Sequence, residues 1–234
     1  MISIVIPTYN ERENIILLIK KINESLVNFN NKYEIIIVDD NSPDKTSQEI
    51  AKVYKRKPNL RLFTRKNTKG LASAILYGIQ KSKGDVIVGM DADFNHPPHA
   101  IKKLINELKH HDLVIASRFI KGGGMQDKAR GVFTYIFNLF LKYIIGFPII
   151  DNMSGFYVIK KDILFKLPIK QIYSGYGEYH LRLVYLAKKQ SLKIKEIPVF
   201  YPKRKHGKSK SNLLKMFFRY LFVAFKLKLT DGKI

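Results

Sequence analysis

Short apolar runs alternate with segments of helical periodicity along the first half of the chain, and this alternation constrains the fold more than any other feature. The apolar runs are rich in Ile and Val and lie at residues 3–6, 33–38, 60–63, 85–90 and 112–117. Short connections between alternating strands and helices are typical of a mostly parallel sheet that helices cover on both faces. We therefore expect an α/β fold. Pro7 is expected to end the first strand, and Asn10 to cap the helix that follows, with Glu13 in place for a capping box.

The fourth apolar run ends in two carboxylates, Asp91 and Asp93, which are followed by Asn95 and two prolines. Alternate side chains of an extended segment point to one side, so these three residues can present oxygens to one point. Hard oxygen ligands of this kind suit Mg²⁺ or Mn²⁺, particularly when a diphosphate completes the coordination shell. An acidic loop that caps the next helix is the alternative interpretation, and a lone Asp-x-Asp favours it.

Polar residues also follow the first and second apolar runs. They are Tyr9 and Glu11 in one case and Asp39 and Asp40 in the other. Ligands of parallel sheets bind beyond the carboxyl ends of the strands, so these residues and the Asp91 turn are expected to share one rim, which favours a site. The chain has no Gly-x-Gly-x-x-Gly after the first strand and no P-loop, which argues against a dinucleotide-dependent oxidoreductase and an NTPase.

The charge of the chain is strongly positive, with 42 lysines and arginines against 19 aspartates and glutamates and a formal net charge of +23. Such a field attracts nucleotide diphosphates, lipid phosphates, anionic bilayers or nucleic acid. There is no cysteine, which excludes disulfides and thiol chemistry. The N-terminus has no basic leader with an apolar core, so we expect a cytoplasmic protein.

The last part of the chain, residues 212–228, is apolar and aromatic but interrupted by basic residues. At helical spacing, Lys208, Lys215, Arg219 and Lys226 fall on one stripe. This pattern favours an amphipathic helix that lies on anionic lipid, and the basic residues come too close together for a membrane span. A solvated face of a core-packing helix is the alternative. We expect a catalytic domain at residues 1–210 and a membrane-surface helix at 211–234.

Several motifs appear in order along nearly the whole chain. They are Ile6-Pro7-Thr8-Tyr9-Asn10-Glu11, Val38-Asp39-Asp40-Asn41-Ser42-Pro43-Asp44, Met90-Asp91-Ala92-Asp93, His96-Pro97-Pro98, Ser117-Arg118-Phe119, Gly122-Gly123-Gly124, Ser154-Gly155-Phe156, Glu196-Ile197-Pro198-Val199, and Arg204 with Gly207-Lys208-Ser209-Lys210. Together they resemble the dolichol-phosphate mannose synthase group of inverting, family-two glycosyltransferases with the GT-A fold.

The resemblance implies roles for individual residues. It implies a nucleotide pocket in which Asp40 reads the base edge, made by Pro7, Tyr9, Glu11, Val38 and Asp40. It implies a sugar-nucleotide and metal centre at Asp91, Ala92 and Asp93, with Asn95 where many members have Gln. Phosphates would be held by Arg118, Arg204 and Lys210. The residues implied to act in catalysis are Asp91, Asp93, Arg118 and Arg204.

The implied reaction moves a sugar, in the first place mannose from GDP-mannose, to a polyprenyl phosphate of the dolichyl type at the cytosolic face of a membrane. A phosphomonoester acceptor has a second pKa near ~6, so it needs orientation more than deprotonation, and Arg130 could meet it. The alternative to that role of Arg130 is a helix-end charge. A UDP-sugar such as UDP-glucose is the alternative donor. A glycan hydroxyl as acceptor would need a general base, for which Glu178 is the candidate; a solvated residue at a helix start is its other interpretation.

A basic membrane- or nucleic-acid-binding protein would also explain the charge. It would not explain paired carboxylates at strand ends, which repel phosphate unless a metal intervenes. No nucleic-acid partner is therefore expected.

Overall fold

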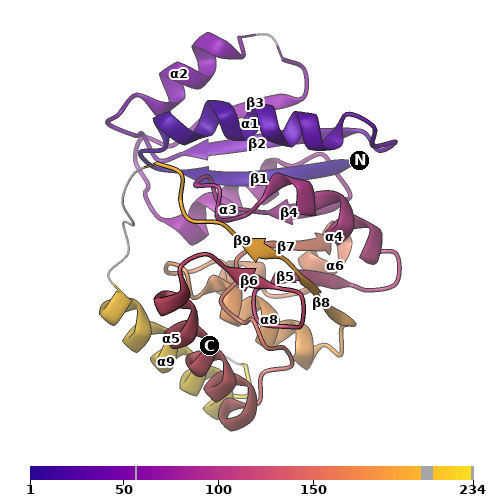
Figure 1. Cartoon of the computed structure of the whole chain (residues 1–234), viewed down its shortest axis with the longest axis vertical. Coiled ribbons are helices and arrows are strands. Elements are labelled where there is room, and N and C mark those ends of the chain that lie inside the picture. The colour runs from indigo at the N-terminus through magenta and orange to yellow at the C-terminus, as the bar shows by residue number, and fades with distance from the viewer. Residues whose placement is uncertain (56, 207–212, 233–234) are drawn as a thin grey trace.

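The computed structural model describes residues 1–55, 57–206 and 213–232 and contains one seven-stranded sheet with helices on both faces (Figure 1). The strand order is β3-β2-β1-β4-β7-β5-β8, and only β7 runs antiparallel to its neighbours. The strands are β1 (Ile2–Thr8), β2 (Tyr33–Asp39), β3 (Leu60–Thr64), β4 (Val86–Gly89), β5 (Leu113–Ser117), β7 (Tyr157–Lys160) and β8 (Ile194–Pro198). A separate parallel pair joins β6 (Gly124–Met125) to β9 (Phe200–Tyr201).

The helices pack against the two faces of this sheet, and each face has its own hydrophobic core. One core contains Ile4 and Ile6 with buried residues of α1 and α4, and the other contains Val5 and Val38 with buried residues of α3, α5 and α8. The helices are α1 (Arg12–Leu26), α2 (Thr46–Val53), α3 (Leu71–Lys81), the 3₁₀ turn η1 (Pro98–Ala100), α4 (Ile101–Glu107), α5 (Lys128–Phe140), the π-helical turn η2 (Leu141–Ile145), α6 (Lys161–Lys166), α7 (Ile169–Ile172), α8 (Tyr179–Lys189) and α9 (Leu213–Leu229). The expected mostly parallel α/β sheet is confirmed, since four of its strand pairs are parallel. Alternate side chains of a strand point into the two different cores, as Ile4 and Val5 do.

Two local predictions at the end of β1 are wrong. The strand continues through Pro7 to Thr8. The pairing with β4 ends at Val5 and Gly89, and the nitrogen of Pro7 faces that unpaired side, so its lack of an N–H costs no hydrogen bond of the sheet. Asn10 is not the N-cap of α1: it has φ 55°, and Glu11 occupies the cap position without a side-chain cap bond.

Further along the chain, helix α2 begins at Thr46, several residues after the end of β2. The Asp39 carboxylate binds the backbone N–H of Ser42 at 3.0 Å and holds an irregular turn before the helix. The antiparallel direction of β7 and the short helices α6 and α7 have no counterpart in the sequence predictions.

The C-terminal helix α9 lies beside α5 at the lower end of the molecule (Figure 1). Phe217 of α9 packs against Phe133 and Phe137 of α5, and Tyr220, Ala224 and other α9 residues join the core. No helix within the described parts of the chain is long and apolar enough to cross a bilayer. The boundary expected at residue 210 and the position of Lys208 lie outside the described residues.

Candidate functional site

A cavity of about 740 Å³ lies at the carboxyl edge of the parallel strands, where the sequence predicts a site. The segments after β1, β2, β4 and β5 line it, together with residues of α3, α5, α8 and α9. The predicted residues that line it are Pro7, Tyr9, Glu11, Asp40, Asp91, Ala92, Asp93, Asn95, Arg118 and Arg204. Arg130 lines it as well.

Two predicted site residues are not found in this lining. The side chain of Val38 is fully buried in the core, at the point where α3 approaches β2 through Gly78, so it does not face the cavity. Lys210 lies outside the described residues.

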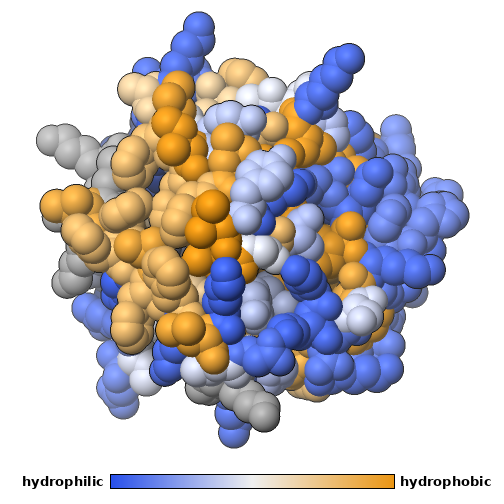
Figure 2. All heavy atoms as spheres, turned by 90° about the horizontal axis from the view of Figure 1, so that it is seen from below, coloured by the Kyte–Doolittle hydropathy of each residue, from blue (hydrophilic) through white to orange (hydrophobic). Residues whose placement is uncertain are grey.

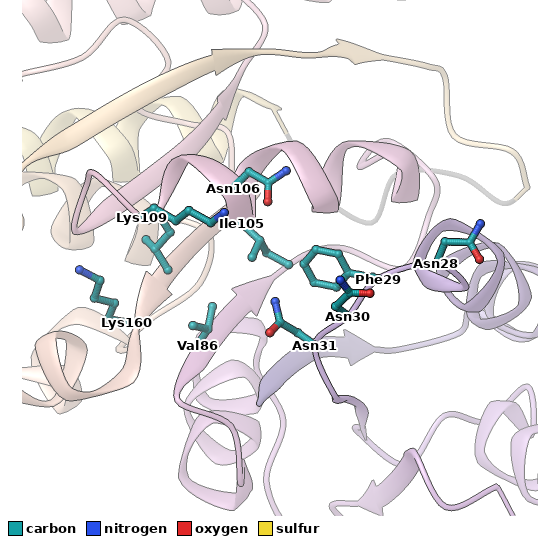
Figure 3. Close-up of a pocket in the computed structure, with 10 residues that line it drawn as sticks. Asn28, Phe29, Asn30, Asn31, Val86, Ile105, Asn106, Lys109 and Lys160 are labelled. Carbon is teal, nitrogen blue, oxygen red and sulfur yellow. The ribbon is translucent and has the colours of Figure 1, made fainter.

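A second hollow, of about 460 Å³, lies at the opposite edge of the sheet, where the parallel strands begin (Figure 3). It is bounded by Val86 at the start of β4, by the end of α4 and by the loop before β2. Asparagine, lysine and apolar side chains line it: Asn28, Phe29, Asn30, Asn31, Val86, Ile105, Asn106, Leu108, Lys109 and Lys160. The described part of this lining contains no carboxylate.

The turn after β4 is held in place by its own polar groups. The Asp93 carboxylate accepts the backbone N–H of Asn95 at 3.1 Å and the Asn95 amide Nδ2 at 2.8 Å. Phe94 between them has φ 69°, which sends Asp93 and Asn95 to neighbouring positions rather than along a regular strand. The Asn95 amide therefore donates to Asp93 through Nδ2, and Oδ1 is the atom that could bind a metal.

The buried ring of His96 fixes this turn through hydrogen bonds. Sequence analysis missed this role, although it identified the His-Pro-Pro motif. The backbone N–H of Asp91 donates to His96 Nδ1 at 2.8 Å, so the opposite nitrogen, Nε2, carries the hydrogen and donates to the carbonyl of Ser154 at 3.0 Å. Burial lowers the pKa of His96 to about 4, so the ring is neutral at physiological pH. His96 thus links the carboxylate turn to the Ser154-Gly155 segment.

Negative charge is concentrated at this turn. The pKa of Asp91 is raised to about 7, first by desolvation in the cavity wall and then by the neighbouring Asp93 carboxylate, although 40% of its side chain is accessible to solvent. Arg204 compensates part of this charge: its guanidinium contacts Asp93 Oδ2 at 2.8 Å and Glu11 Oε1 at 3.2 Å. Excess carboxylate charge in an oxygen-rich turn fits a divalent cation.

The metal prediction is met only in part by the geometry. No group of three or more His, Cys, Asp or Glu side chains among the described residues is placed to hold a metal ion. Asp91 and Asp93 supply two carboxylates, so the Asn95 amide oxygen and oxygens of a bound diphosphate would have to complete the shell.

Asp40 is predicted to read a base edge, and in the structure it organises the wall where a base would lie. Its carboxylate accepts Arg65 Nε at 2.7 Å and the backbone N–H of Gly70 at 2.7 Å. The ammonium of Lys69 then stands 5.2 Å from the ring centroid of Tyr9. Neither Arg65 nor Lys69 was identified from the sequence, because no motif connects them to Asp40.

Arg118 lines the cavity, but its charge is compensated by a buried partner. Asp151, which is fully buried, accepts Arg118 Nε at 2.8 Å and Nη2 at 2.7 Å. The backbone N–H of Asp151 donates in turn to Glu196 of β8 at 2.8 Å. Arg130 differs, because no carboxylate of the described residues lies within ion-pair distance of its side chain.

Glu178, the candidate general base, is absent from the described lining of the cavity. Its side chain is 4% exposed and accepts Arg219 Nη2 of α9 at 2.7 Å, with Arg182 Nη2 at 3.9 Å. The carboxylate therefore fastens α9 to the start of α8, and the hypothesis that it acts as a base finds no support in its position.

Comparison with known proteins gives a consistent family assignment. The family model described as "Glycosyl transferase family 2" matches residues 3–167. A dolichol-phosphate mannosyltransferase of Pyrococcus furiosus is 34% identical over all of this chain, which spans 65% of that protein's length. A dolichol-phosphate mannosyltransferase of Saccharomyces cerevisiae is 31% identical, with 89% of this chain and 80% of the relative covered. An undecaprenyl-phosphate mannosyltransferase of Micrococcus luteus is 28% identical over 88% of this chain and 85% of its own length.

Among solved structures, glucosyl-3-phosphoglycerate synthase from Mycobacterium tuberculosis, in complex with Mn²⁺, UDP and glucosyl-3-phosphoglycerate, superposes with a TM-score of 0.72. The sequences are 20% identical, and the match covers 97% of this chain and 79% of that one. This likeness concerns the fold, and it agrees with the GT-A architecture.

Proposed function

The chain belongs to glycosyl transferase family 2, and from this premise we propose that it transfers a sugar from a nucleotide-sugar donor to a polyprenyl phosphate. The observation that carries the proposal is that one cavity joins a carboxylate turn, Asp91 and Asp93, to two cations, Arg118 and Arg130. A carboxylate turn suits a metal-bound diphosphate, and separate cations suit a second phosphate. The named activities of the relatives support this pairing of donor and acceptor.

On the donor side, we propose GDP-mannose as the first donor to test and a UDP-sugar such as UDP-glucose as the second. The mannosyltransferase relatives favour the first, and the UDP-bound structural neighbour is the reason to keep the second. Tyr9, Lys69 and the Asp40 wall would receive the base, and Arg204 would exchange its carboxylate partners for the diphosphate. Mg²⁺ or Mn²⁺ held by Asp91, Asp93 and Asn95 would neutralise charge on the departing diphosphate.

On the acceptor side, a phosphomonoester fits the groups present. Its second pKa is near ~6, so it arrives as an anion and requires orientation by cations rather than a base. Arg130, at the start of α5, and Arg118 face the same cavity. A glycan hydroxyl would require a carboxylate in the position of a base, and the buried pairing of Glu178 with Arg219 speaks against that reaction.

The lipid part of such an acceptor needs an apolar surface beside the cavity. Helices α5 and α9 and the turn η2 expose large apolar side chains, which gather in one region of the face in Figure 2. They include Val132, Phe133, Ile136, Tyr143, Ile144, Leu214, Phe218, Phe222 and Leu229. Arg130 of α5 and Met216 and Tyr220 of α9 line the cavity itself. We propose that this face, called the α5–α9 face below, lies on the cytosolic surface of an anionic membrane.

The decisive experiment incubates the purified protein with Mg²⁺ or Mn²⁺, a short polyprenyl phosphate and a panel of GDP- and UDP-sugars. Mass spectrometry of the lipid fraction should find a sugar linked to the lipid phosphate with one donor of the panel. Donor binding or hydrolysis without any such product would contradict the acceptor part of the proposal, and no binding of any nucleotide sugar would contradict all of it.

A further inference from the structure

One residue that lines the cavity has a buried nitrogen without a hydrogen-bond partner. Within the described part of the chain, three buried side-chain atoms have none: Asn14 Oδ1, Asn152 Oδ1 and His180 Nε2. Of these three residues, His180 alone lines the cavity. A buried polar atom without a partner destabilises a fold, so an unpaired atom in the wall of a binding cavity points to a ligand.

The chemical character of this nitrogen follows from the other side of the ring. His180 Nδ1 lies 2.9 Å from the carbonyl oxygen of Asn152, and a carbonyl can only accept, so Nδ1 carries the hydrogen. Nε2 is then a bare acceptor. The ring is 1% exposed, and burial lowers its pKa to about 4, which keeps it neutral at physiological pH. The partner that Nε2 lacks must therefore be a hydrogen-bond donor.

The ring is also held firmly in position. It lies in the first turn of α8, and the residue it binds, Asn152, donates its backbone N–H to Asn138 Oδ1 of α5 at 2.8 Å. Two tyrosine rings lie close to it, Tyr179 at 6.2 Å and Tyr157 at 6.0 Å between centroids. An acceptor fixed in this way can select among ligands that differ by one donor group.

The surroundings decide which part of a ligand would supply the donor. A phosphate oxygen would repel the lone pair of Nε2, and the cavity already offers Arg118, Arg130 and Arg204 for phosphates. The wall that contains His180 also contains Ser154 and Gly155, and His96 joins that wall to the carboxylate turn. Between a diphosphate at that turn and an acceptor phosphate at the arginines, the group left to meet this wall is the sugar.

We propose that Nε2 of His180 accepts a hydrogen bond from a hydroxyl of the transferred hexose, which makes His180 a specificity-determining residue of the donor site. This inference rests on the proposed nucleotide-sugar transfer. It goes beyond that proposal by assigning a residue to the sugar ring.

A cycle of variants and donor analogues tests the assignment. The wild-type protein and His180→Phe are compared with the native donor and with its deoxy analogues, one hydroxyl at a time, by kcat/KM. For one deoxy analogue we expect the kcat/KM of the wild type to fall about tenfold to hundredfold below its value with the native donor. His180→Phe should show a fall of similar size already with the native donor, and its kcat/KM should not fall further with that analogue. Loss of the bond to Asn152 weakens all donors alike, so only the difference between analogues reports on Nε2.

Three controls separate the possible outcomes. His99→Gln, an exposed histidine of η1, should respond to every analogue as the wild type does. Binding of the nucleoside diphosphate without sugar should be the same in His180→Phe and the wild type. If His180→Phe does not fold, His180→Gln replaces it, and its amide oxygen should preserve part of the discrimination.

If removing any hydroxyl lowers kcat/KM by the same factor in His180→Phe as in the wild type, the two changes act independently. That result would overturn the role of His180 while leaving the transfer reaction intact. If the wild type binds no nucleotide sugar at all, the proposed function fails and this inference fails with it.

Discussion

The two edges of the sheet carry hollows of different chemical character, although strand β4 runs from one to the other. At the carboxyl edge, Glu11, Asp40, Asp93 and Arg118 are each less than a tenth exposed. At the amino edge, Lys109 is exposed, and Lys160 is 40% exposed on the side chain, 3.9 Å from Asp112 (Figure 3). Burying charge is unfavourable even when it is paired, and buried charged groups gather at functional sites, which favours the carboxyl edge as the site.

The contrast shows that hollow shape alone does not identify a site in this fold. Both hollows are several hundred Å³ in volume. What separates them is that carboxylates and guanidinium groups at the carboxyl edge are withdrawn from water and hold one another, as Asp93 and Arg204 do. Substitutions matched between the two edges should therefore have unequal effects.

The largest effect is expected at the carboxylate turn. Asp93→Asn keeps the size of the side chain but removes the charge that Arg204 and a divalent ion would meet. We expect kcat/KM for sugar transfer to fall about 10³-fold. Glu107→Gln in α4, close to the amino-edge hollow, serves as the matched control and should keep near wild-type activity. An Asp93→Asn protein that transfers sugar normally would remove the reason to place a diphosphate at this turn.

The next effect concerns stability. Asp151→Asn leaves the buried guanidinium of Arg118 without its carboxylate, and we expect the free energy of unfolding in urea to fall by about 3–5 kcal/mol. At the amino edge, Asp112→Asn weakens a long, partly exposed ion pair with Lys160 and keeps an amide oxygen that can still accept the exposed backbone N–H of Lys193, so it should cost less than about 1 kcal/mol. Equal losses in the two variants would mean that the Arg118–Asp151 pair is no more constrained than a surface pair.

The sequence predicts one side of the carboxyl-edge cavity well because that side is encoded locally. Each apolar run ends next to its polar residues, so Tyr9, Asp40 and Asp91 could be placed at strand ends without knowing the fold. Val38 shows the limit of this approach. Side chains alternate along a strand, and the motif that contains Val38 does not say that its side chain turns into the core.

The other side of the cavity depends on contacts between distant parts of the chain, and these were missed. Arg118 meets Asp151 only because β7 enters the sheet between β4 and β5, an insertion that the apolar pattern does not reveal. Glu178 shows the same limit, because its partner Arg219 comes 41 positions later, on a helix whose docking the sequence does not specify. His96 was identified within a motif, but its role depends on a hydrogen bond to the carbonyl of Ser154, which lies 58 positions later in the chain.

A third comparison uses one cation from each hollow. Arg130→Met removes a cavity cation for which the described residues supply no carboxylate within ion-pair distance, and we expect kcat/KM for the polyprenyl phosphate to fall about tenfold to hundredfold. Titration with the nucleotide sugar alone should give an unchanged affinity, because the acceptor phosphate is the expected partner. Lys109→Met at the amino edge should alter neither quantity. Weaker donor binding in Arg130→Met would move this arginine to the donor phosphates.

The smallest effect is expected on the α5–α9 face, which is next to the carboxyl-edge cavity. Phe222 is 68% exposed there, and Phe222→Ser should reduce binding to anionic vesicles and transfer to long polyprenyl phosphates in those vesicles by about tenfold. Transfer to a short acceptor dissolved without vesicles should not change, since the cavity is intact. Phe165→Ser in α6 provides the matched control, because Phe165 is 46% exposed but does not belong to this face. If both variants weaken vesicle binding equally, general hydrophobicity rather than this face attaches the protein to lipid. If neither does, the cavity must receive its acceptor by another route.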